Sequence, residues 1–215
     1  MTEPEYRGDL FVLVADKDME QTLNGLLGRP QSLCIRSVTC KIHPHPEHDA
    51  GCRTGGVDLL RTFCNQYQHA LLMFDREGSG RDDREAGEIE NELEKQLARN
   101  GWNDERAAVI VLDPELEIWV WSDSPEVDRI MGWSGQIPAL RDWLVDEEFL
   151  TVREGKPGRP KEAFRAALKE KRKQPSAALF KQMAASVSFG RCTDSAFQKL
   201  TTKLREWFPV ESDIP

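Results

Sequence analysis

The chain has 215 residues and carries 37 acidic against 29 basic side chains, for a net charge of −8. This length suffices for one large domain or for a domain with a substantial extension, and the negative charge excludes a protein that coats nucleic acid over its whole surface. No apolar run is long enough to cross a bilayer, and the acidic residues 1–5 lack the apolar region of a signal peptide, so we expect a cytoplasmic protein without membrane contact. The five cysteines are irregularly spaced and do not indicate a disulfide framework.

The first half of the chain alternates between strand and helix patterns. Strands are predicted at residues 9–14, 32–39, 69–74 and 107–112, from short apolar or β-branched runs. Helices are predicted at residues 19–27, 57–67 and 84–100, with Asp18 as the first N-cap, and Pro114 is expected to begin a further helix. This alternation predicts an α/β fold of three layers with a mainly parallel central sheet.

Acidic side chains follow three of these strands at the point where each ends. They are Asp16 and Asp18, Asp75 and Glu77, and Glu115 and Glu117. Because the carboxyl ends of parallel strands share one edge of a sheet, we expect these acids to converge there. Such a cluster repels itself unless a cation neutralises it, and its oxygen ligands favour Mg²⁺ or Mn²⁺ over zinc.

Roles at this edge follow from the positions of the acids. The predicted metal ligands are Asp16, Asp75, Glu77 and Glu117, and the predicted catalytic residues are Asp75, Glu77, Glu115 and Glu117. Taken alone, Asp75 and Glu77 have a simpler interpretation, in which Asp75 caps a turn and Glu77 is solvated.

Residues 40–56 are predicted to form a loop that is rich in histidine and cysteine. Zinc could bind among Cys40, His43, His45, His48 and Cys52, although their spacing matches no familiar zinc finger. The other interpretation is a surface loop above the sheet edge, where His48 and Asp49 help to position a substrate.

The last third of the chain is predicted to be helical. Helices are expected at residues 137–145, 160–173, 177–187 and 194–207, with their Trp and Phe side chains in the core. The predicted organisation is therefore an α/β core at 1–125 and a helical extension at 126–215 packed on it.

A basic segment at residues 153–173 interrupts this extension. It holds nine Lys or Arg against three Glu, a local net charge of +6 that leaves −14 for the rest of the chain. The predicted contacts to DNA, RNA or an acidic partner are Lys156, Arg159, Lys161, Lys171, Arg172 and Lys173, with binding that is sensitive to salt. The prolines and glycines around Arg159 fit either an extended hook on phosphates or a solvated linker.

Residues 12–18 followed by residues 72–80 resemble the TOPRIM domain of topoisomerases, primases and the nucleases of the overcoming-lysogenisation-defect group. Segments 113–119, 156–162 and 207–209 more closely resemble small TOPRIM-like proteins encoded in bacterial anti-phage defence islands. The resemblance covers residues 9–125. It implies a Glu after the first strand and an Asp-x-Asp after a later one, which together bind magnesium for phosphodiester chemistry.

The sequence departs from this family pattern at two positions. Ala15 occupies the place of the family's metal-binding Glu, so that Asp16 or Asp18 would have to substitute, and Glu77 replaces the second Asp. Neither Tyr6 nor Tyr67 is placed as a topoisomerase nucleophile.

Three functions follow from the residues and the resemblance. The first is a Mg²⁺-dependent nuclease or phosphodiester-processing enzyme of a defence system. The second is a catalytically inactive interaction subunit of a defence complex, bound to its other subunits, and the third is a sensor that binds a nucleotide through metal at the acid edge.

Overall fold

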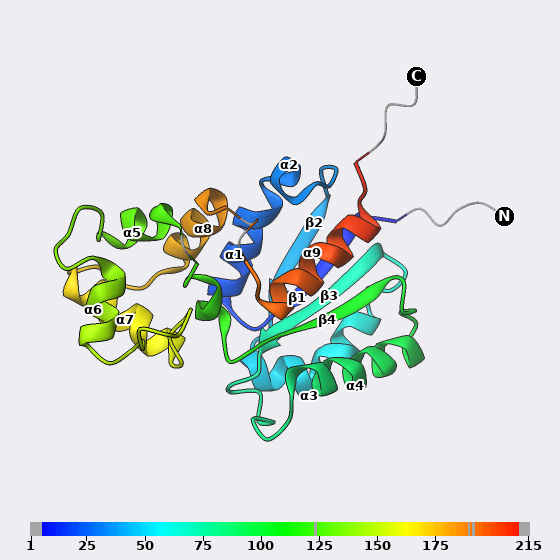
Figure 1. Cartoon of the computed structure of the whole chain (residues 1–215). Helices are drawn as coiled ribbons and strands as arrows, with labels where there is room; N and C mark the ends of the chain where they lie inside the picture. The colour runs from blue at the N-terminus through cyan, green and yellow to red at the C-terminus, as the bar shows by residue number, and fades with distance from the viewer. Residues whose placement is uncertain (1–5, 123, 189, 191, 211–215) are drawn as a thin grey trace.

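Four parallel strands form one central sheet in the order β2-β1-β3-β4 (Figure 1). The computed structural model describes residues 6–122, 124–188, 190 and 192–210, so the acidic residues 1–5 and Asp123 lie outside the described residues. The strands are β1 Gly8–Val14, β2 Cys40–Pro44, β3 Tyr67–Asp75 and β4 Ala107–Leu112. The predicted α/β fold with a parallel central sheet is confirmed.

The burial of each strand follows from its composition. All six residues of β4 are buried, as are the last six residues of β3 and the last five of β1, which fits their continuous apolar runs inside a parallel sheet. By contrast, β2 lies at the edge and alternates between half-buried and exposed residues.

Helices cover both faces of the sheet and complete the three predicted layers. In the view of Figure 1, α3 and α4 lie below the sheet, and α1 and α9 lie above it. These helices are α1 Lys17–Leu27, α3 His48–Arg61, α4 Ala86–Arg99 and α9 Ser195–Trp207. Because α9 packs on β4, the end of the chain contributes a layer to the central fold.

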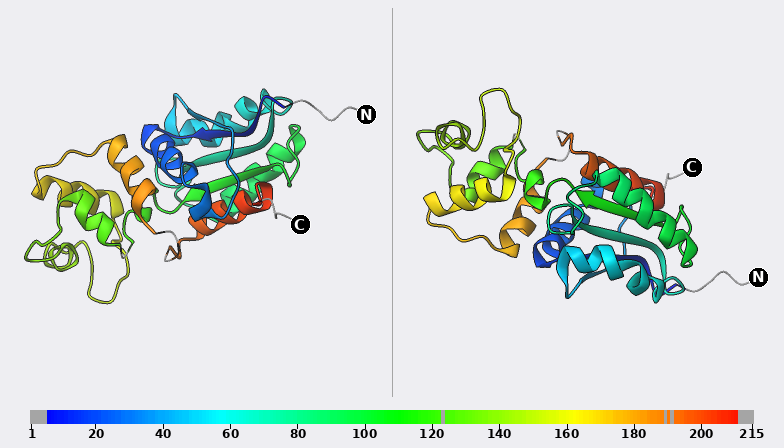
Figure 2. Two further views of the ribbon diagram at one scale, coloured as in Figure 1. Left: turned by 90° about the horizontal axis from the view of Figure 1, so that it is seen from above. Right: turned by 90° about the horizontal axis from the view of Figure 1, so that it is seen from below.

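The middle of the chain forms a helical lobe beyond the carboxyl edge of the sheet (Figure 2). It contains the 3₁₀ helix η1 Leu116–Trp119, then α5 Pro125–Met131, α6 Leu140–Asp146, α7 Pro160–Glu170 and α8 Ala177–Ser186. Indole N–H groups fasten both ends of α7, since Trp121 donates to the carbonyl of Pro160 and Trp133 to that of Ala167. The lobe returns to the sheet through α8, which packs along α1.

The predicted strand at residues 32–39 is wrong. Pro30 begins a single helical turn, α2 Pro30–Leu33, which ends at Cys34 in the left-handed region, and the second strand starts only at Cys40. The apolar side chains of Leu33 and Ile35 are nevertheless buried, and Ile35 forms an isolated antiparallel β-bridge with Pro209.

The predicted loop at residues 40–56 is also wrong, because it contains β2 and the first half of α3. Its glycines permit close packing inside a helix and do not break it. A Cβ at Gly51 would lie 2.2 Å from the His45 ring, and one at Gly56 would lie 2.9 Å from Leu72 of β3. These helical glycines cost helix propensity but let α3 approach its neighbours.

Two smaller predictions also change. Asp16, and not Asp18, caps α1, where its carboxylate accepts the backbone N–H of Met19. After Pro114 the chain forms only the short η1, which begins at Leu116. In the described part of the chain, no helix combines the length and apolarity required to cross a membrane.

Candidate metal centre

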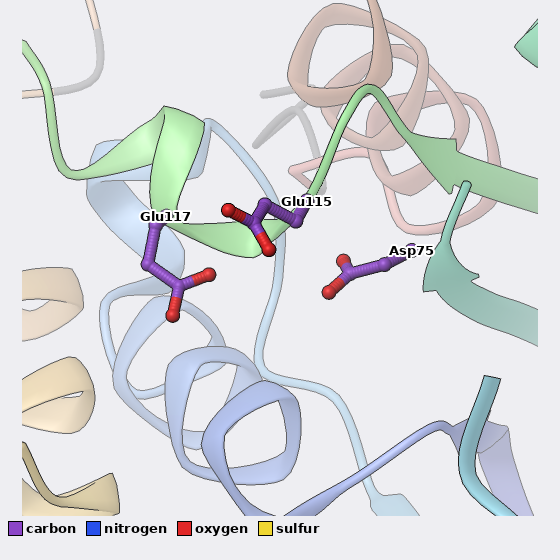
Figure 3. A group of neighbouring side chains, drawn as sticks. All are labelled: Asp75, Glu115 and Glu117. Carbon is purple, nitrogen blue, oxygen red and sulfur yellow. The ribbon is translucent and has the colours of Figure 1, made fainter. Parts of the chain in front are cut away.

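Three buried carboxylates meet at the carboxyl edge of the sheet. Asp75 is the last residue of β3, Glu115 directly precedes η1, and Glu117 lies within η1. One oxygen of each lies within 4.8 Å of the others, and Figure 3 shows the three side chains pointing into one shared space. We call these three residues the acid site.

Pairing between β3 and β4 brings these residues together. Asp75 is opposite Leu112, and the backbone N–H groups of Arg76 and Glu77 donate to the carbonyls of Leu112 and Pro114. The chain leaving β4 therefore runs alongside the end of β3 before it turns into η1. The strand order reverses between β1 and β3, and open parallel sheets bind ligands at such a reversal, beyond the carboxyl ends of the strands. The acid site lies at this edge of the sheet.

Burial makes the acid site electrostatically costly. Asp75, Glu115 and Glu117 are 6%, 4% and 6% exposed, and Oδ1 of Asp75 is buried without a hydrogen-bond partner in the described structure. Burial raises the pKa of Asp75 well above its ordinary value, and the charges of Asp49 and Glu117 raise it further. Burial likewise raises the pKa of Glu117 from 4.5 to about 7.

The separation of the oxygens suits one divalent cation. Ligand oxygens on an octahedral Mg²⁺ lie roughly 3 to 4 Å apart, because each metal–oxygen distance is about 2.1 Å. Oxygens within 4.8 Å of one another need only a small movement to reach that spacing. A bound cation would supply the partner that Asp75 lacks and offset the repulsion among the three carboxylates.

Lys161 places a positive charge at the acid site. At the start of α7, its backbone N–H donates to Oε1 of Glu115 at 2.9 Å and its ammonium to Oε2 at 3.1 Å. Burial by itself lowers the pKa of Lys161, but the carboxylates of Glu117 and Glu115 outweigh it and the net shift is upward. The sequence places Lys161 among the candidate nucleic-acid contacts, and the structure brings it to the acid site.

Asp49 supports the end of β3. Its carboxylate oxygen Oδ1 accepts the backbone N–H of Asp75 at 2.8 Å, and burial raises its pKa. Its neighbour His48 is exposed and adopts a positive φ of 51°. The sequence predicts that this pair positions a substrate, and in the structure Asp49 also holds a residue of the acid site.

Other predicted ligands lie outside the acid site. Glu77 is exposed, and among the described residues it is not a member of the close group of carboxylates. Asp16 is likewise outside that group and serves as the N-cap of α1, although its charge contributes to the raised pKa of Asp75. Burial and the charge of Asp16 raise the pKa of Asp18, which is half-buried at the same edge. Ala15 is fully buried.

The zinc interpretation of residues 40–52 gains no support from the structure. Cys40 begins β2, whereas His45 follows its carboxyl end, so the extended strand separates them by roughly 13 Å or more. In the described part of the chain, no close group of potential metal ligands includes Cys40, His43, His45, His48 or Cys52.

The other predicted nucleic-acid contacts in the basic segment lie in different environments. The ammonium of Lys171 lies 3.8 Å from the centre of the Trp133 ring, and that of Lys173 donates to the carbonyl of Ile130. Arg159 stacks over the Phe149 ring at 5.6 Å, Lys156 is half-buried, and Arg172 is exposed. Several of these cations therefore also hold the lobe together.

The fold and the acid site define a class, an α/β protein with buried carboxylates at the carboxyl edge of a parallel sheet. Comparison with protein-family models, with curated proteins and with solved structures finds no match.

Proposed function

We propose that this protein is a TOPRIM-like, Mg²⁺- or Mn²⁺-dependent phosphodiester hydrolase, a nuclease of a bacterial anti-phage defence system. The observation that supports it is the acid site, where three buried carboxylates converge and Oδ1 of Asp75 has no partner in the described structure. A divalent cation held there would neutralise a phosphate oxygen and lower the pKa of an attacking water. The defence role rests on the sequence resemblance alone.

Asp75→Asn tests this proposal, because it keeps the shape of the side chain and removes its charge. Cleavage of single- and double-stranded DNA and RNA with Mg²⁺ or Mn²⁺ should fall by more than about 100-fold. Asp104→Asn is the control, since Asp104 is exposed beyond α4 in the segment that precedes β4, and it should cleave like the wild type. Glu77→Gln should have a much smaller effect than Asp75→Asn, because Glu77 is exposed. Absence of cleavage by the wild type across these substrates would rule out the hydrolase.

A second candidate is a catalytically inactive interaction subunit or nucleotide sensor of a defence complex. Ala15 in place of the family's Glu, and the engagement of both Glu115 oxygens by Lys161, favour this alternative. It predicts stable co-purification with proteins encoded by neighbouring genes, or heat of nucleotide binding in calorimetry. A monodisperse monomer that binds neither would contradict it.

A further inference from the structure

The acid site contains an internal cation, the ammonium of Lys161. It lies 3.1 Å from Oε2 of Glu115, and its charge also acts on Asp18, Asp49, Asp75 and Glu117. A lysine ammonium carries one positive charge, whereas the three carboxylates of the acid site can carry three negative charges. The charge of Lys161 can therefore offset only one of them. Lys161 hydrogen-bonds to Glu115, whereas Oδ1 of Asp75 has no hydrogen-bond partner in the described structure.

The two hydrogen bonds from Lys161 differ in how easily they can break. The backbone N–H bond to Oε1 is fixed by the position of α7, whose first turn is also fastened by the Trp121 indole at Pro160. The ammonium, by contrast, ends a flexible side chain that is 37% exposed. It can move into solvent while α7 remains in place, and this movement frees Oε2 of Glu115.

From this geometry we infer that Lys161 is the resident counter-ion of the acid site, and that a divalent cation binds there by displacing the Lys161 ammonium from Glu115. The inference rests on the proposed metal site and concerns its regulation. The displaced ammonium leaves Oε2 of Glu115 and Oδ1 of Asp75 as open oxygen ligands beside Glu117. Lys161 thus holds the metal-free site together and weakens metal binding, so that the site loads only at higher metal concentrations.

Thermal unfolding of the full chain, stripped with EDTA and titrated with MnCl₂, tests this inference. Without metal, Lys161→Met should melt below the wild type, because its carboxylates lose their counter-ion. With Mn²⁺, its melting temperature should rise more than that of the wild type, and its half-saturating Mn²⁺ concentration should fall at least about tenfold. Lys161→Gln should show the same gain and serves as the second variant if Lys161→Met does not fold.

Lys199 provides a matched control. Its ammonium bridges Glu90 and Glu94 at 3.0 and 2.7 Å, and its side chain is 26% exposed, yet this pair lies outside the acid site. Lys199→Met should lose stability without any change in the response to Mn²⁺. Lys161→Arg retains the charge and should require about as much Mn²⁺ as the wild type.

The outcomes separate this inference from the proposed function. Equal Mn²⁺ responses in Lys161→Met and the wild type, or no response in either, would overturn the inference, while wild-type cleavage would still support the hydrolase. A gain of Mn²⁺ affinity in Lys161→Met together with no wild-type cleavage would uphold the inference and remove the hydrolase.

Discussion

The three carboxylates of the acid site are not equivalent. Glu115 accepts two hydrogen bonds from Lys161, whereas Oδ1 of Asp75 accepts none in the described structure. Glu117 is buried among other acids, and burial raises its pKa to about 7, so the folded protein keeps a proton there up to a higher pH than it would on an exposed glutamate. These differences predict opposite effects on stability for two chemically identical substitutions.

Glu117→Gln should stabilise the metal-free protein at high pH. Because the folded pKa of about 7 exceeds the ordinary value of 4.5, the folded state binds more protons, and the free energy of unfolding falls as pH rises from 4.5 through 7. The variant does not lose this contribution, so it should exceed the wild type by about 2 to 3 kcal/mol at pH 8 and by much less at pH 5. Urea unfolding in EDTA at both pH values measures the difference.

Glu115→Gln is the comparison at the same site. It removes the charged partner of Lys161 and turns an amide N–H₂ toward donors, so we expect a loss of about 1 to 3 kcal/mol at both pH values. Part of the full cost of breaking a buried ion pair is relieved because the Lys161 side chain is 37% exposed. Equal stabilisation by both substitutions would contradict the assignment of Lys161 to Glu115.

At the scale of elements, contact between α1 and α8 joins the sheet to the helical lobe. The contact is close because Gly25 of α1 has no side chain. A Cβ built there would lie 2.6 Å from the carbonyl oxygen of Lys181 and 2.7 Å from Cβ of Ala184. Since both atoms belong to helix α8, a flexible side chain cannot relieve the clash, and α8 itself would have to move.

Gly25→Ala should therefore destabilise the protein by about 1 to 3 kcal/mol, because overpacking outweighs the gain in helix propensity. Gly87→Ala in α4 is the matched control, since nothing lies within 4 Å of its Cβ position. It should be neutral or stabilising by up to about 1 kcal/mol. Chemical denaturation of both variants gives the comparison, and a stabilising Gly25→Ala would mean that α8 packs less closely than described.

At the scale of the whole molecule, the acid site lies where the sheet meets the helical lobe. Asp75 belongs to the sheet, whereas Glu117 belongs to η1 and Lys161 to α7 of the lobe. The chain then returns to the sheet, where α9 packs on β4, and the side chains of Leu200 and Leu204 in α9 are buried. One layer of the fold thus combines α1 and α9, which are far apart in the sequence.

Residues 1–125 expressed alone should not fold cooperatively. Without residues 126–215, the face of β4 beneath α9 and the side of α1 beneath α8 would be exposed to water, and burial of that apolar surface would be lost. Thermal unfolding followed by circular dichroism should show no single sharp transition. Cooperative melting near that of the full chain would show instead that the α/β core is an independent unit.

Much of the fold could be predicted from the sequence because its signals are local. The apolar runs of β1, β3 and β4 require burial on two faces, and helical periodicity identifies α4 and α9. Prediction failed at residues 32–56, where the signals conflict. Pro30, Pro44, Pro46 and Gly51 look like loop residues, yet Pro30 begins α2, Pro44 ends β2 and Gly51 lies within α3.

The sequence alone determined the α/β alternation and the presence of acids after three of the strands, since apolar period and chain order specify both. Only the tertiary structure decided which acids meet, because whether a side chain at a strand end points inward depends on contacts with distant segments. It groups Asp75 with Glu115 and Glu117, leaves Glu77 in solvent, and brings Lys161 to Glu115 across 46 positions of sequence. Neither local propensity nor spacing carries that information, since it arises from how the lobe packs against the sheet.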